Sequence, residues 1–496
     1  MKSYFQVALC LLLCFNSITA QSPQKPNVLF IFADDQTFES IGSLNNNEVI
    51  TPNLDRLKSM GTTFQYAFNM GTWSPAVCVA SRAMMNTGKS VWHAAAYEKS
   101  LPQGGTKYMP TRMKPYSIEH KVPKAYWSEY MREAGYDTYM TGKWHVKVDA
   151  QDVFDVAKHV RGGMPNQSKE RYARTYIEGH PDTTWTPYDK SKGGFWEGGK
   201  HWSEIVGDDA LEFIDMAKVK DDPFFMYVAF NAPHDPRQSP KKYVDMYPVE
   251  DITVPENFLP FYPYAEDLGV GSELRDEKLG PFPRTEYSVK VNRQEYYAII
   301  THMDAQIGRI LDALEASGKA DNTYIIFTAD HGLALGDHGF IGKQNLYDRS
   351  IRVPFFIAGP GIKKDKTNNE MIYLQDAMAT ALDIAGSDAV EDVDFNSVLP
   401  LCSGKQKKGE SSIYGAYLGS QFMVRTERYK MIIYPNLDVV RLYDLKKDPH
   451  EMKDLAAQAK YRKTMDELLE EFLQLQQEMD DPFDVTEGYE NFFSKL

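Results

Sequence analysis

Cysteine, positive charge and long apolar segments are all scarce in this sequence. It has four Cys among 496 residues, so few disulfides are available. Its formal net charge is −14 at pH 7, which argues against broad electrostatic binding to nucleic acid, because such binding needs a basic face. Beyond the first twenty residues, no segment is apolar enough to predict a transmembrane helix. We therefore expect neither a nucleic-acid partner nor an integral membrane segment.

The first twenty residues are predicted to be a signal peptide for export. Lys2 gives a weakly positive start, residues 7–15 form a short apolar run, and residues 17–20 offer small side chains for cleavage near Ala20. The run is too short to span a bilayer. Its two Cys each follow a Leu, which disfavours a lipid-anchored Cys. We expect an exported protein, periplasmic or secreted, that keeps Cys78 and Cys402.

Four apolar runs, rich in β-forming residues, are each followed by a burst of polar residues. The runs cover residues 27–32, 137–141, 224–230 and 324–328, and the bursts are Asp34-Asp35, Lys143-Trp144-His145, Pro233-His234 and Asp330-His331-Gly332. Such runs predict strands buried on both faces. An amphipathic helix between them has one apolar face, formed by Ile307, Ile310, Leu311 and Leu314. The pattern predicts an α/β fold in which ligands bind at the carboxyl ends of the strands.

The pattern changes after about residue 400. Segments 412–418, 422–426 and 429–434 are predicted to be short antiparallel strands, and segment 461–478 a charged helix containing several Leu. We therefore predict a catalytic domain over residues 21–400 and a smaller C-terminal α+β domain over residues 401–496. Stretches 102–123, 148–201 and 235–287, rich in Pro, Gly, Tyr and charge, are predicted to be loops and insertions around a pocket.

Cys78 opens the segment Cys78-Val79-Ala80-Ser81-Arg82, which continues to Gly88. Taken alone, it is equally well explained as a buried free Cys at the start of a helix. With the motifs below, it resembles the signature of formylglycine-dependent type I sulfatases of the alkaline phosphatase superfamily, which implies a large, mixed but mostly parallel sheet flanked by helices. The resemblance also implies that a maturase oxidises Cys78 to formylglycine, whose hydrated form attacks sulfur. Ala80 replaces the Pro of most members and resembles the variant accepted by radical-type maturases.

The position of Cys78 supports this interpretation. Ser74-Pro75 precedes helix-compatible residues, so Cys78 is expected in the first turn of a helix. The positive end of that helix favours an anionic nucleophile and a bound sulfate. Arg82, one turn later, is expected on the same face, within hydrogen-bonding reach of the modified side chain.

Three Asp residues predict a metal site. An isolated acidic pair such as Asp34-Asp35 is usually a helix or turn cap. Together with Asp330 at the end of another strand, the pair forms an oxygen-rich site that suits a hard cation. The resemblance implies one divalent cation, Ca²⁺, held by Asp34, Asp35, the oxygen of the modified Cys78, Asp330 and His331.

The segment that contains Lys143 and His145 resembles the second sulfatase signature. Alternating positions on an extended segment are expected to put both side chains on one face. The resemblance implies that Lys143 and Lys343 bind the sulfate and that His145 stabilises the hydrated nucleophile or assists its breakdown. It also implies that His234, in the segment Pro-His-Asp-Pro, binds the sulfate and protonates the leaving alcohol.

The substrate is expected to be a sulfated sugar or a polysaccharide fragment. The segment after His234 resembles those of iduronate-2-sulfatase and choline sulfatase, and Asp235, Arg237 and Gln238 are predicted to contact substrate. His338 is predicted to shape its loop rather than to touch substrate. A closing motif at residues 442–451 extends the resemblance from about residue 26 to 455.

The sequence thus predicts an exported sulfuric ester hydrolase. One alternative is a phosphodiesterase or phosphonate monoester hydrolase of the same superfamily; Lys143 with His145 disfavours it, because those relatives tend to have hydroxyl-bearing residues there. Another alternative is a non-catalytic glycan-binding protein on the same scaffold. Such a protein should lack the nucleophile or the metal carboxylates, and this sequence retains Cys78, Asp34 and Asp330.

Overall fold

The computed structural model describes residues 24–495 except Asn45, 101–122, 164–168, Thr175, Pro181 and Trp196. The predicted signal peptide and nearly all of the predicted loop 102–123 lie outside the described residues. Among the described residues, no helix is both long enough and apolar enough to cross a membrane.

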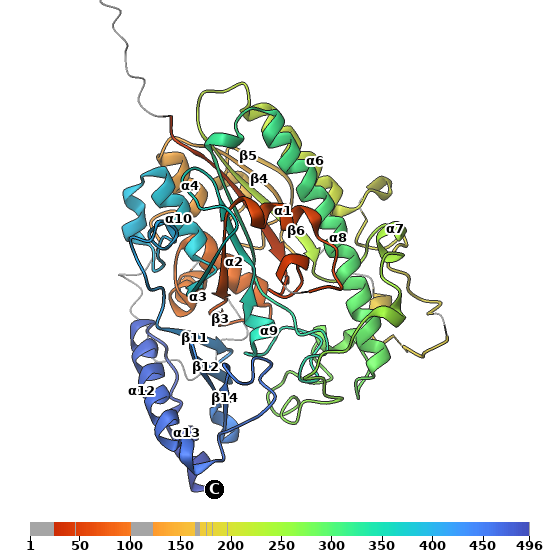
Figure 1. The fold of residues 1–496 in the computed structure, drawn as a ribbon, viewed down its shortest axis with the longest axis vertical. Helices are drawn as coiled ribbons and strands as arrows, with labels where there is room; N and C mark the ends of the chain where they lie inside the picture. The colour runs from red at the N-terminus through yellow and green to blue at the C-terminus, as the bar shows by residue number, and fades with distance from the viewer. Residues whose placement is uncertain are drawn as a thin grey trace, which may run out of the picture.

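The main sheet has nine strands in the order β10-β2-β9-β7-β1-β6-β4-β5, with β8 paired to β2 (Figure 1). The strands are β1 (Asn27–Asp34), β2 (Thr62–Phe68), β4 (Asp137–Lys143), β5 (Val156–Arg161), β6 (Phe224–Pro233), β7 (Thr323–Ala329), β8 (Arg352–Val353), β9 (Phe355–Ala358) and β10 (Lys366–Tyr373). The four predicted strands are β7, β1, β6 and β4, which are parallel neighbours. Because β9 runs antiparallel to β7 and β2, the sheet is mixed but mostly parallel, as predicted.

The central strands bring the polar bursts together at one edge of the sheet. Every residue of β1 and β6 is buried, which explains their continuous apolar sequences. In the strand register Asp34 lies beside Pro233, and Ala33 lies beside Ala329. The residues that follow β1, β6 and β7 therefore emerge next to one another.

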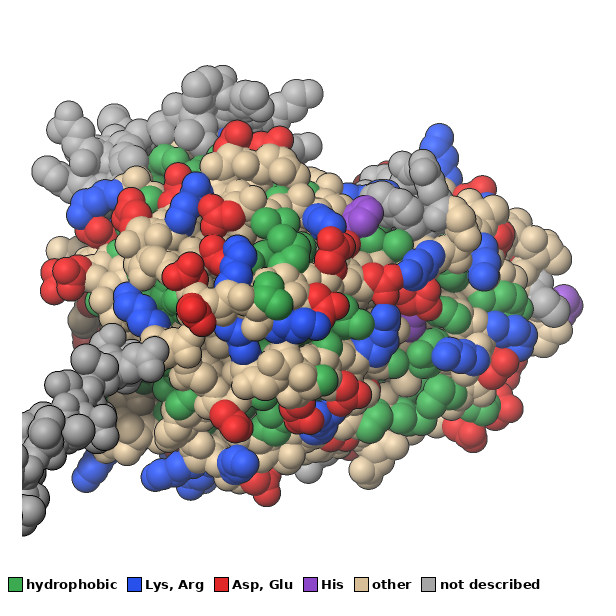
Figure 2. Space-filling model, turned by 90° about the horizontal axis from the view of Figure 1, so that it is seen from above, with side chains coloured by type: hydrophobic (Ala, Val, Ile, Leu, Met, Phe, Trp, Pro, Cys, Tyr) green, Lys and Arg blue, Asp and Glu red, His purple; other side chains and the backbone are tan. Residues whose placement is uncertain are grey.

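Helices cover both faces of the main sheet (Figure 1). On one side lie α1 (Pro52–Met60), α6 (Trp202–Ala217) and α8 (Glu286–Ala316), and on the other lie α2 (Val77–Thr87), α3 (Val91–Ser100), α4 (Trp127–Glu133) and α10 (Asp376–Ala385). Shorter helices are α5 (Ala150–Val153), α7 (Lys241–Val244), α9 (Asp348–Ile351) and α11 (Leu399–Ser403). The predicted apolar face of α8 is confirmed, because its four Ile and Leu residues are all buried. On the face that Figure 2 shows, positive and negative side chains are interspersed.

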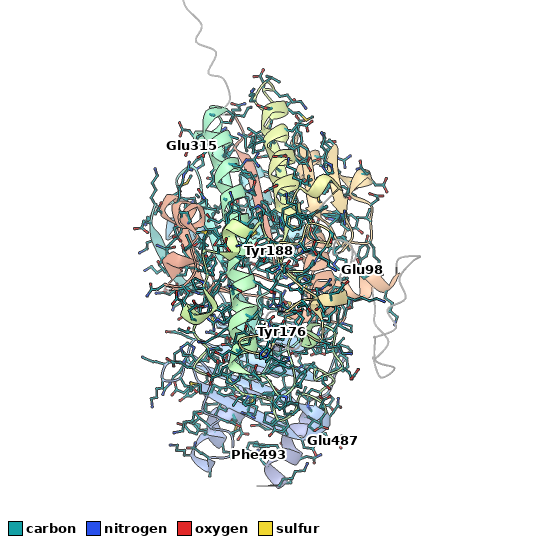
Figure 3. The ribbon with its side chains drawn as sticks, turned by 90° about the vertical axis from the view of Figure 1, so that its right-hand side faces the viewer. Glu98, Tyr176, Tyr188, Glu315, Glu487 and Phe493 are labelled. Atoms are coloured by element: carbon teal, nitrogen blue, oxygen red, sulfur yellow. The ribbon has the colours of Figure 1, made fainter. Side chains whose placement is uncertain are left out.

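The insertion between β5 and α6 packs on α8. Arg174 and Trp185 of this insertion both bind Glu295 of α8, at 2.7 and 3.2 Å. Figure 3 shows Tyr176 and Tyr188 of the same insertion in front of α8. The hydroxyl of Tyr176 donates to the backbone oxygen of Leu279, which ties the insertion to the segment before α8. The predicted insertion is thus anchored on the long helix.

A second sheet has five strands in the order β14-β13-β12-β11-β3. Its strands are β3 (Gly71–Thr72), β11 (Ser412–Tyr417), β12 (Gln421–Thr426), β13 (Tyr429–Tyr434) and β14 (Val439–Asp444), and α12 (Arg462–Glu478) and α13 (Thr486–Ser494) lie beside it (Figure 1). The predicted antiparallel strands and helix are confirmed. Strand β3 comes from the N-terminal part of the chain and pairs with β11. A domain boundary at residue 400 stays a prediction.

Strand β3 fixes the segment that leads into α2. Gly71 has a φ of +102°, and a Cβ added there would lie 1.9 Å from the backbone oxygen of Ala416. Only glycine permits this close approach and this backbone conformation. The C-terminal sheet therefore holds the chain just before the helix that carries Cys78.

Candidate active site

Three buried carboxylates meet at the carboxyl edge of the main sheet. Asp34 ends β1, Asp35 follows it with a φ of +67°, and Asp330 follows β7. Ligand atoms of these three residues and of Cys78 all lie within 4.8 Å of one another. Each of the three carboxylates is at most 2% exposed. The chain thus concentrates negative charge where water cannot solvate it.

The electrostatics of this group fit a bound cation. Burial, together with repulsion from Asp330, raises the pKa of Asp34 and raises that of Asp35 to about 6. Burial opposes ionisation of Asp330 as well, but Arg82 and Lys143 hold its pKa well below the usual range. A divalent cation would offset this repulsion, and carboxylate oxygens are the ligands that Ca²⁺ and Mg²⁺ prefer.

His331 is not a member of the converging group in the described structure. Its Nδ1 lies 2.9 Å from the backbone oxygen of Gly332. Burial lowers the pKa of its imidazole to about 4, so the ring is neutral at physiological pH. A role for His331 as a metal ligand stays a prediction.

Cys78 is the second residue of α2 and is buried, as predicted for the first turn of a helix. Its Sγ lies 3.3 Å from Asp34 Oδ1 and accepts a hydrogen bond from Lys343 Nζ at 2.9 Å. Burial and the neighbouring carboxylates raise the pKa of the thiol. These neighbours therefore do not favour a thiolate nucleophile.

Three buried cations surround the carboxylates. Arg82 Nε donates to Asp330 Oδ2 at 2.9 Å, Lys143 Nζ donates to Asp34 Oδ2 at 2.5 Å, and Lys343 Nζ donates to Asp35 Oδ2 at 2.6 Å. Arg82 thus contacts the carboxylates, whereas the sequence predicted a bond to the modified Cys78. Each lysine lies between a carboxylate and the cavity described below.

His145 does not lie on an extended segment, so that part of the prediction was wrong. Strand β4 ends at Lys143, and His145 has a φ of +58°, in the left-handed region. The chain turns at the end of the strand, and alternation along β4 cannot explain the position of His145. Both side chains nevertheless line the same cavity.

His234 is held by the residue that follows it. Its Nδ1 lies 2.7 Å from Asp235 Oδ1, and its Nε2 lies 3.4 Å from Asp35 Oδ2. Asp235 Oδ2 in turn binds Arg171 Nε at 2.7 Å and accepts from the Tyr172 hydroxyl at 3.0 Å. An Asp on Nδ1 fixes the orientation of an imidazole and directs Nε2 toward the site.

The predicted substrate contacts near His234 lie outside the cavity lining. Asp235 binds the ring of His234, Arg237 Nη1 donates to Asn292 Oδ1 at 2.7 Å, and Gln238 accepts from the backbone N–H of Gly194. All three side chains are buried. The structure therefore gives them supporting positions behind the cavity.

His338 also lies away from the cavity. Its ring stacks on Tyr347, with the ring centroids 3.8 Å apart, and its Nε2 is 3.2 Å from Asn257 Nδ2. These contacts agree with the predicted loop-shaping role.

A cavity of about 380 Å³ opens above this group. Among its lining residues are Cys78, Lys143, His145, His234, Leu274, Arg275, Asp276, Lys343 and Gln344. Sequence reasoning missed Leu274, Arg275, Asp276 and Gln344. Gln344 directly follows Lys343, which is a signal that could have identified it. Leu274, Arg275 and Asp276 lie in a segment whose sequence shows no strand or helix periodicity.

Comparison with known proteins connects this geometry to a family. The family model described as sulfatase matches residues 26–387, and one described as N-sulphoglucosamine sulphohydrolase, C-terminal, matches residues 336–478. An arylsulfatase from Clostridium perfringens is 30% identical over 476 residues, which cover 90% of this chain and 93% of that protein. An N-acetylglucosamine-6-O-sulfatase from Bacteroides thetaiotaomicron is 26% identical over an alignment that covers 95% of this chain and 90% of that protein. The solved structure of BT4656 with D-glucosamine-2-N,6-O-disulfate superposes with a TM-score of 0.70 at 24% identity, covering 92% of this chain and 99% of that one.

Proposed function

This chain belongs to the sulfatase family and is a sulfuric ester hydrolase, and we propose that it removes sulfate from sulfated sugars through a formylglycine formed at Cys78. The observation that carries the proposal is the convergence of Cys78 with Asp34, Asp35 and Asp330 at one cavity. A non-catalytic glycan-binding protein would have no need to bury three like charges around a Cys.

The three Asp residues would hold one divalent cation, which we propose to be Ca²⁺. Their oxygens form the hard donor set that such a cation prefers, and burial with mutual repulsion makes the empty set costly. When bound, the cation supplies charge that orients and activates an oxygen nucleophile. The formylglycine that a maturase would form from Cys78 supplies that oxygen, which the thiol cannot.

Lys143 and Lys343 bind the sulfuryl oxygens in this proposal. Both ammonium groups are about 1% exposed and line the cavity beside Cys78. Fixed, buried cations stabilise the charge that spreads over these oxygens as the ester bond breaks. The mixed surface charge and the net charge of −14 make such a local cluster necessary for an anionic substrate.

His234 is the proposed acid for the leaving alcohol. In its protonated form the ring would donate one N–H to Asp235 through Nδ1 and present the other, on Nε2, toward Asp35 and the cavity for transfer. A sugar alkoxide is a poor leaving group and needs that proton. His145, in the same cavity, is proposed to stabilise the nucleophile.

A sulfated sugar is the proposed substrate. The relative from Bacteroides thetaiotaomicron is named for N-acetylglucosamine-6-O-sulfate, and the BT4656 structure holds a sulfated glucosamine. A predicted signal peptide, with export to the periplasm or beyond, fits a polysaccharide fragment as substrate. A screen of desulfation on defined sulfated oligosaccharides tests this part of the proposal.

The reaction class has its own test. We expect 4-nitrophenyl sulfate to be hydrolysed with a higher kcat/KM than bis(4-nitrophenyl) phosphate or a phosphonate monoester. Lys143 and His145 both line the cavity, and this pair disfavours the phosphorus-ester relatives, which tend to have hydroxyl-bearing residues at these positions. A preference for the phosphorus esters would favour the phosphodiesterase or phosphonate monoester hydrolase alternative.

A further inference from the structure

Arg275 lies in the active-site cavity but differs from the other cations there. It precedes the short 3-10 helix Asp276–Leu279 and lines the cavity together with Cys78 and His234. Its side chain is 44% exposed, whereas those of Lys143 and Lys343 are about 1% exposed. Arg275 therefore stands at the mouth of the cavity, and the two lysines form its floor.

The guanidinium of Arg275 is fixed along one edge. Its Nε and Nη2 lie 2.8 and 2.6 Å from Asp276 Oδ1. Asp276 Oδ2 accepts a second bond, from Gln344 Nε2 at 2.6 Å. Among the described residues, no hydrogen bond to Nη1 of Arg275 is found. Asp276 thus holds the edge of the guanidinium formed by Nε and Nη2, and Nη1 remains available to bind a ligand.

The ion pair with Asp276 accounts for only part of this arrangement. The Asp276 side chain is 6% exposed, and although burial opposes its ionisation, the charge of Arg275 lowers the pKa of its carboxyl. That pairing uses Nε and Nη2 and leaves Nη1 without a bond among the described residues. A planar guanidinium held by a carboxylate at the mouth of an anion-binding cavity is suited to bind a second oxyanion.

We propose that Arg275 binds a second acidic group on the sugar that carries the scissile sulfate. The cavity of about 380 Å³ holds more than a sulfate group, so the sugar ring extends from the floor toward the mouth. The second group is an oxyanion, either another sulfate or a uronate carboxylate. The inference rests on the proposed function and narrows the substrate class to sugars with two acidic substituents.

The test compares matched substrates that differ by one acidic group. The probes are N-acetylglucosamine 6-sulfate against D-glucosamine-2-N,6-O-disulfate, sugar sulfates whose sulfated ring does or does not carry a uronate carboxylate, and 4-nitrophenyl sulfate. The wild type should show a higher kcat/KM on the doubly acidic member of at least one pair. Arg275→Gln should reduce that preference about 10- to 100-fold, mainly through KM, which is the range for losing a hydrogen bond to a charged group.

Two further variants sharpen the result. Arg275→Lys keeps the charge but loses the planar fork, so it should retain part of the preference. Arg428→Gln is a matched control, because Arg428 is 50% exposed, pairs with Asp444, and lies outside the cavity. It should leave the preference as in the wild type.

The opposing outcomes are distinct. If Arg275→Gln lowers kcat/KM equally on both members of every pair, Arg275 acts only through Asp276. That result would overturn this inference and leave the proposed function standing. Equal kcat/KM of the wild type on both members of every pair would also overturn this inference. Turnover of 4-nitrophenyl sulfate with no turnover of any sugar would overturn the proposed sugar substrate as well.

Discussion

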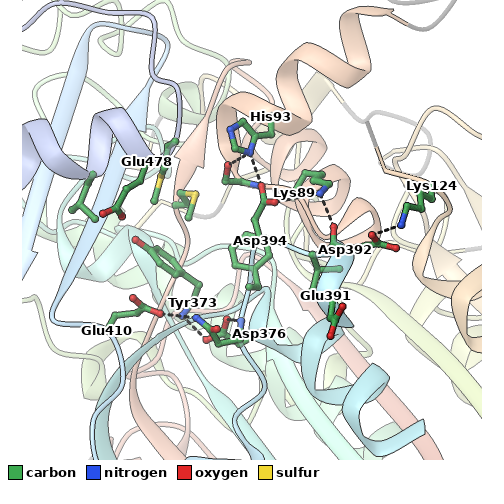
Figure 4. A pocket seen from close by; sticks show the side chains of 17 residues that line it. Lys89, His93, Lys124, Tyr373, Asp376, Glu391, Asp392, Asp394, Glu410 and Glu478 are labelled. Carbon is green, nitrogen blue, oxygen red and sulfur yellow. Dashed lines mark hydrogen bonds and ion pairs between the residues drawn. The ribbon is translucent and has the colours of Figure 1, made fainter. Parts of the chain in front are cut away.

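Two cavities of this protein lie beside groups of carboxylates and differ in the charge of their own walls. The first is the active-site cavity, which is lined in the described structure by three cations and one carboxylate, Asp276, above the three buried Asp residues. The second, of about 600 Å³, lies between α3, the segment before α11 and the end of α12 (Figure 4). Its carboxylates are Asp376, Glu391, Asp392, Asp394, Glu410 and Glu478, and His93 lies beside them. It thus has more acidic residues than the active site.

Two carboxylates of the second cavity accept hydrogen bonds from the backbone. Asp376 accepts from the backbone N–H groups of Tyr373 and Asn396, and Asp394 accepts from that of Ser90. Dashed lines in Figure 4 mark bonds of Asp376 and Asp394. In the described structure, the converging groups of possible metal ligands contain none of these residues. The two cavities differ in the convergence of carboxylates and buried cations on one Cys, and not in the number of acids alone.

The largest effect should come from the nucleophile. Cys78→Ala should lower kcat by about 10⁴-fold or more, because it removes the attacking group itself. Cys402→Ala is the matched control, since Cys402 is also buried and free but lies outside the cavity. Peptide mass spectrometry should find formylglycine at position 78 in active wild type. Full activity in protein that carries only unmodified Cys78 would contradict the mechanism.

Removing one of the proposed metal carboxylates should have the next largest effect. Asp34→Asn should cost at least about 10²-fold in kcat/KM, because changes outside the ligand set alone cost about 10–100-fold in metal affinity. Asp394→Asn, in the second cavity, should leave kcat/KM within a few-fold of the wild type. Prolonged treatment with a chelator should abolish wild-type activity, and Ca²⁺ should restore it. Activity that survives complete metal removal would refute the assignment.

The sequence predicts the central strands better than the edges of the sheet. Strands β1, β6 and β7 each contain a continuous apolar run because both of their faces are buried, and β4 is buried from its second residue onward. Strand β10, by contrast, begins with exposed polar residues at the edge, and β5 is half-exposed along its length. Such strands form through pairing with a neighbour, and a single sequence does not contain that information.

The site was predictable where residues follow strands and not where they come from loops. Asp34, Lys143, His234 and Asp330 each stand at or just after a strand end, so the parallel sheet brings them together. Arg275 enters the cavity from a long connection whose path depends on tertiary contacts. Sequence spacing therefore could not connect it to the site.

The proposed acid role of His234 predicts a selective effect. His234→Ala should slow sugar sulfates by an extra factor of about 10²–10⁴ relative to 4-nitrophenyl sulfate, because nitrophenolate leaves without a proton. Lys343→Ala should slow both substrates similarly, since it removes charge stabilisation from the sulfuryl group. The measurement is the single-turnover rate on each substrate.

Asp235 allows that prediction to be sharpened. Asp235→Asn should show the same selectivity as His234→Ala with a smaller loss, because the ring keeps its position but loses the carboxylate on Nδ1. Asp209→Asn, which alters an Asp–His pair with His159 outside the cavity, is the control. Equal losses on both substrates for His234→Ala would mean that His234 only binds sulfate.

The smallest effect should come from the second cavity and should appear in stability. Burial opposes ionisation of Asp394, but the hydrogen bond and charge of His93 hold its pKa at about 2. Because this folded-state pKa lies below the unfolded value of about 3.9, the ionised carboxylate stabilises the fold at all pH values above about 4, and the contribution is lost as pH falls toward 2. Asp394→Asn should therefore reduce the free energy of unfolding by about 1–2 kcal/mol at pH 7.

Asp392→Asn, which loses a mostly exposed pair with Lys124, should change the free energy of unfolding by less than about 1 kcal/mol. Chemical denaturation of the wild type and both variants between pH 7 and pH 3 measures this directly. A penalty for Asp394→Asn that grows as the pH falls would show that the charge of Asp394 does not stabilise the fold, and the contrast between the two cavities would need another explanation.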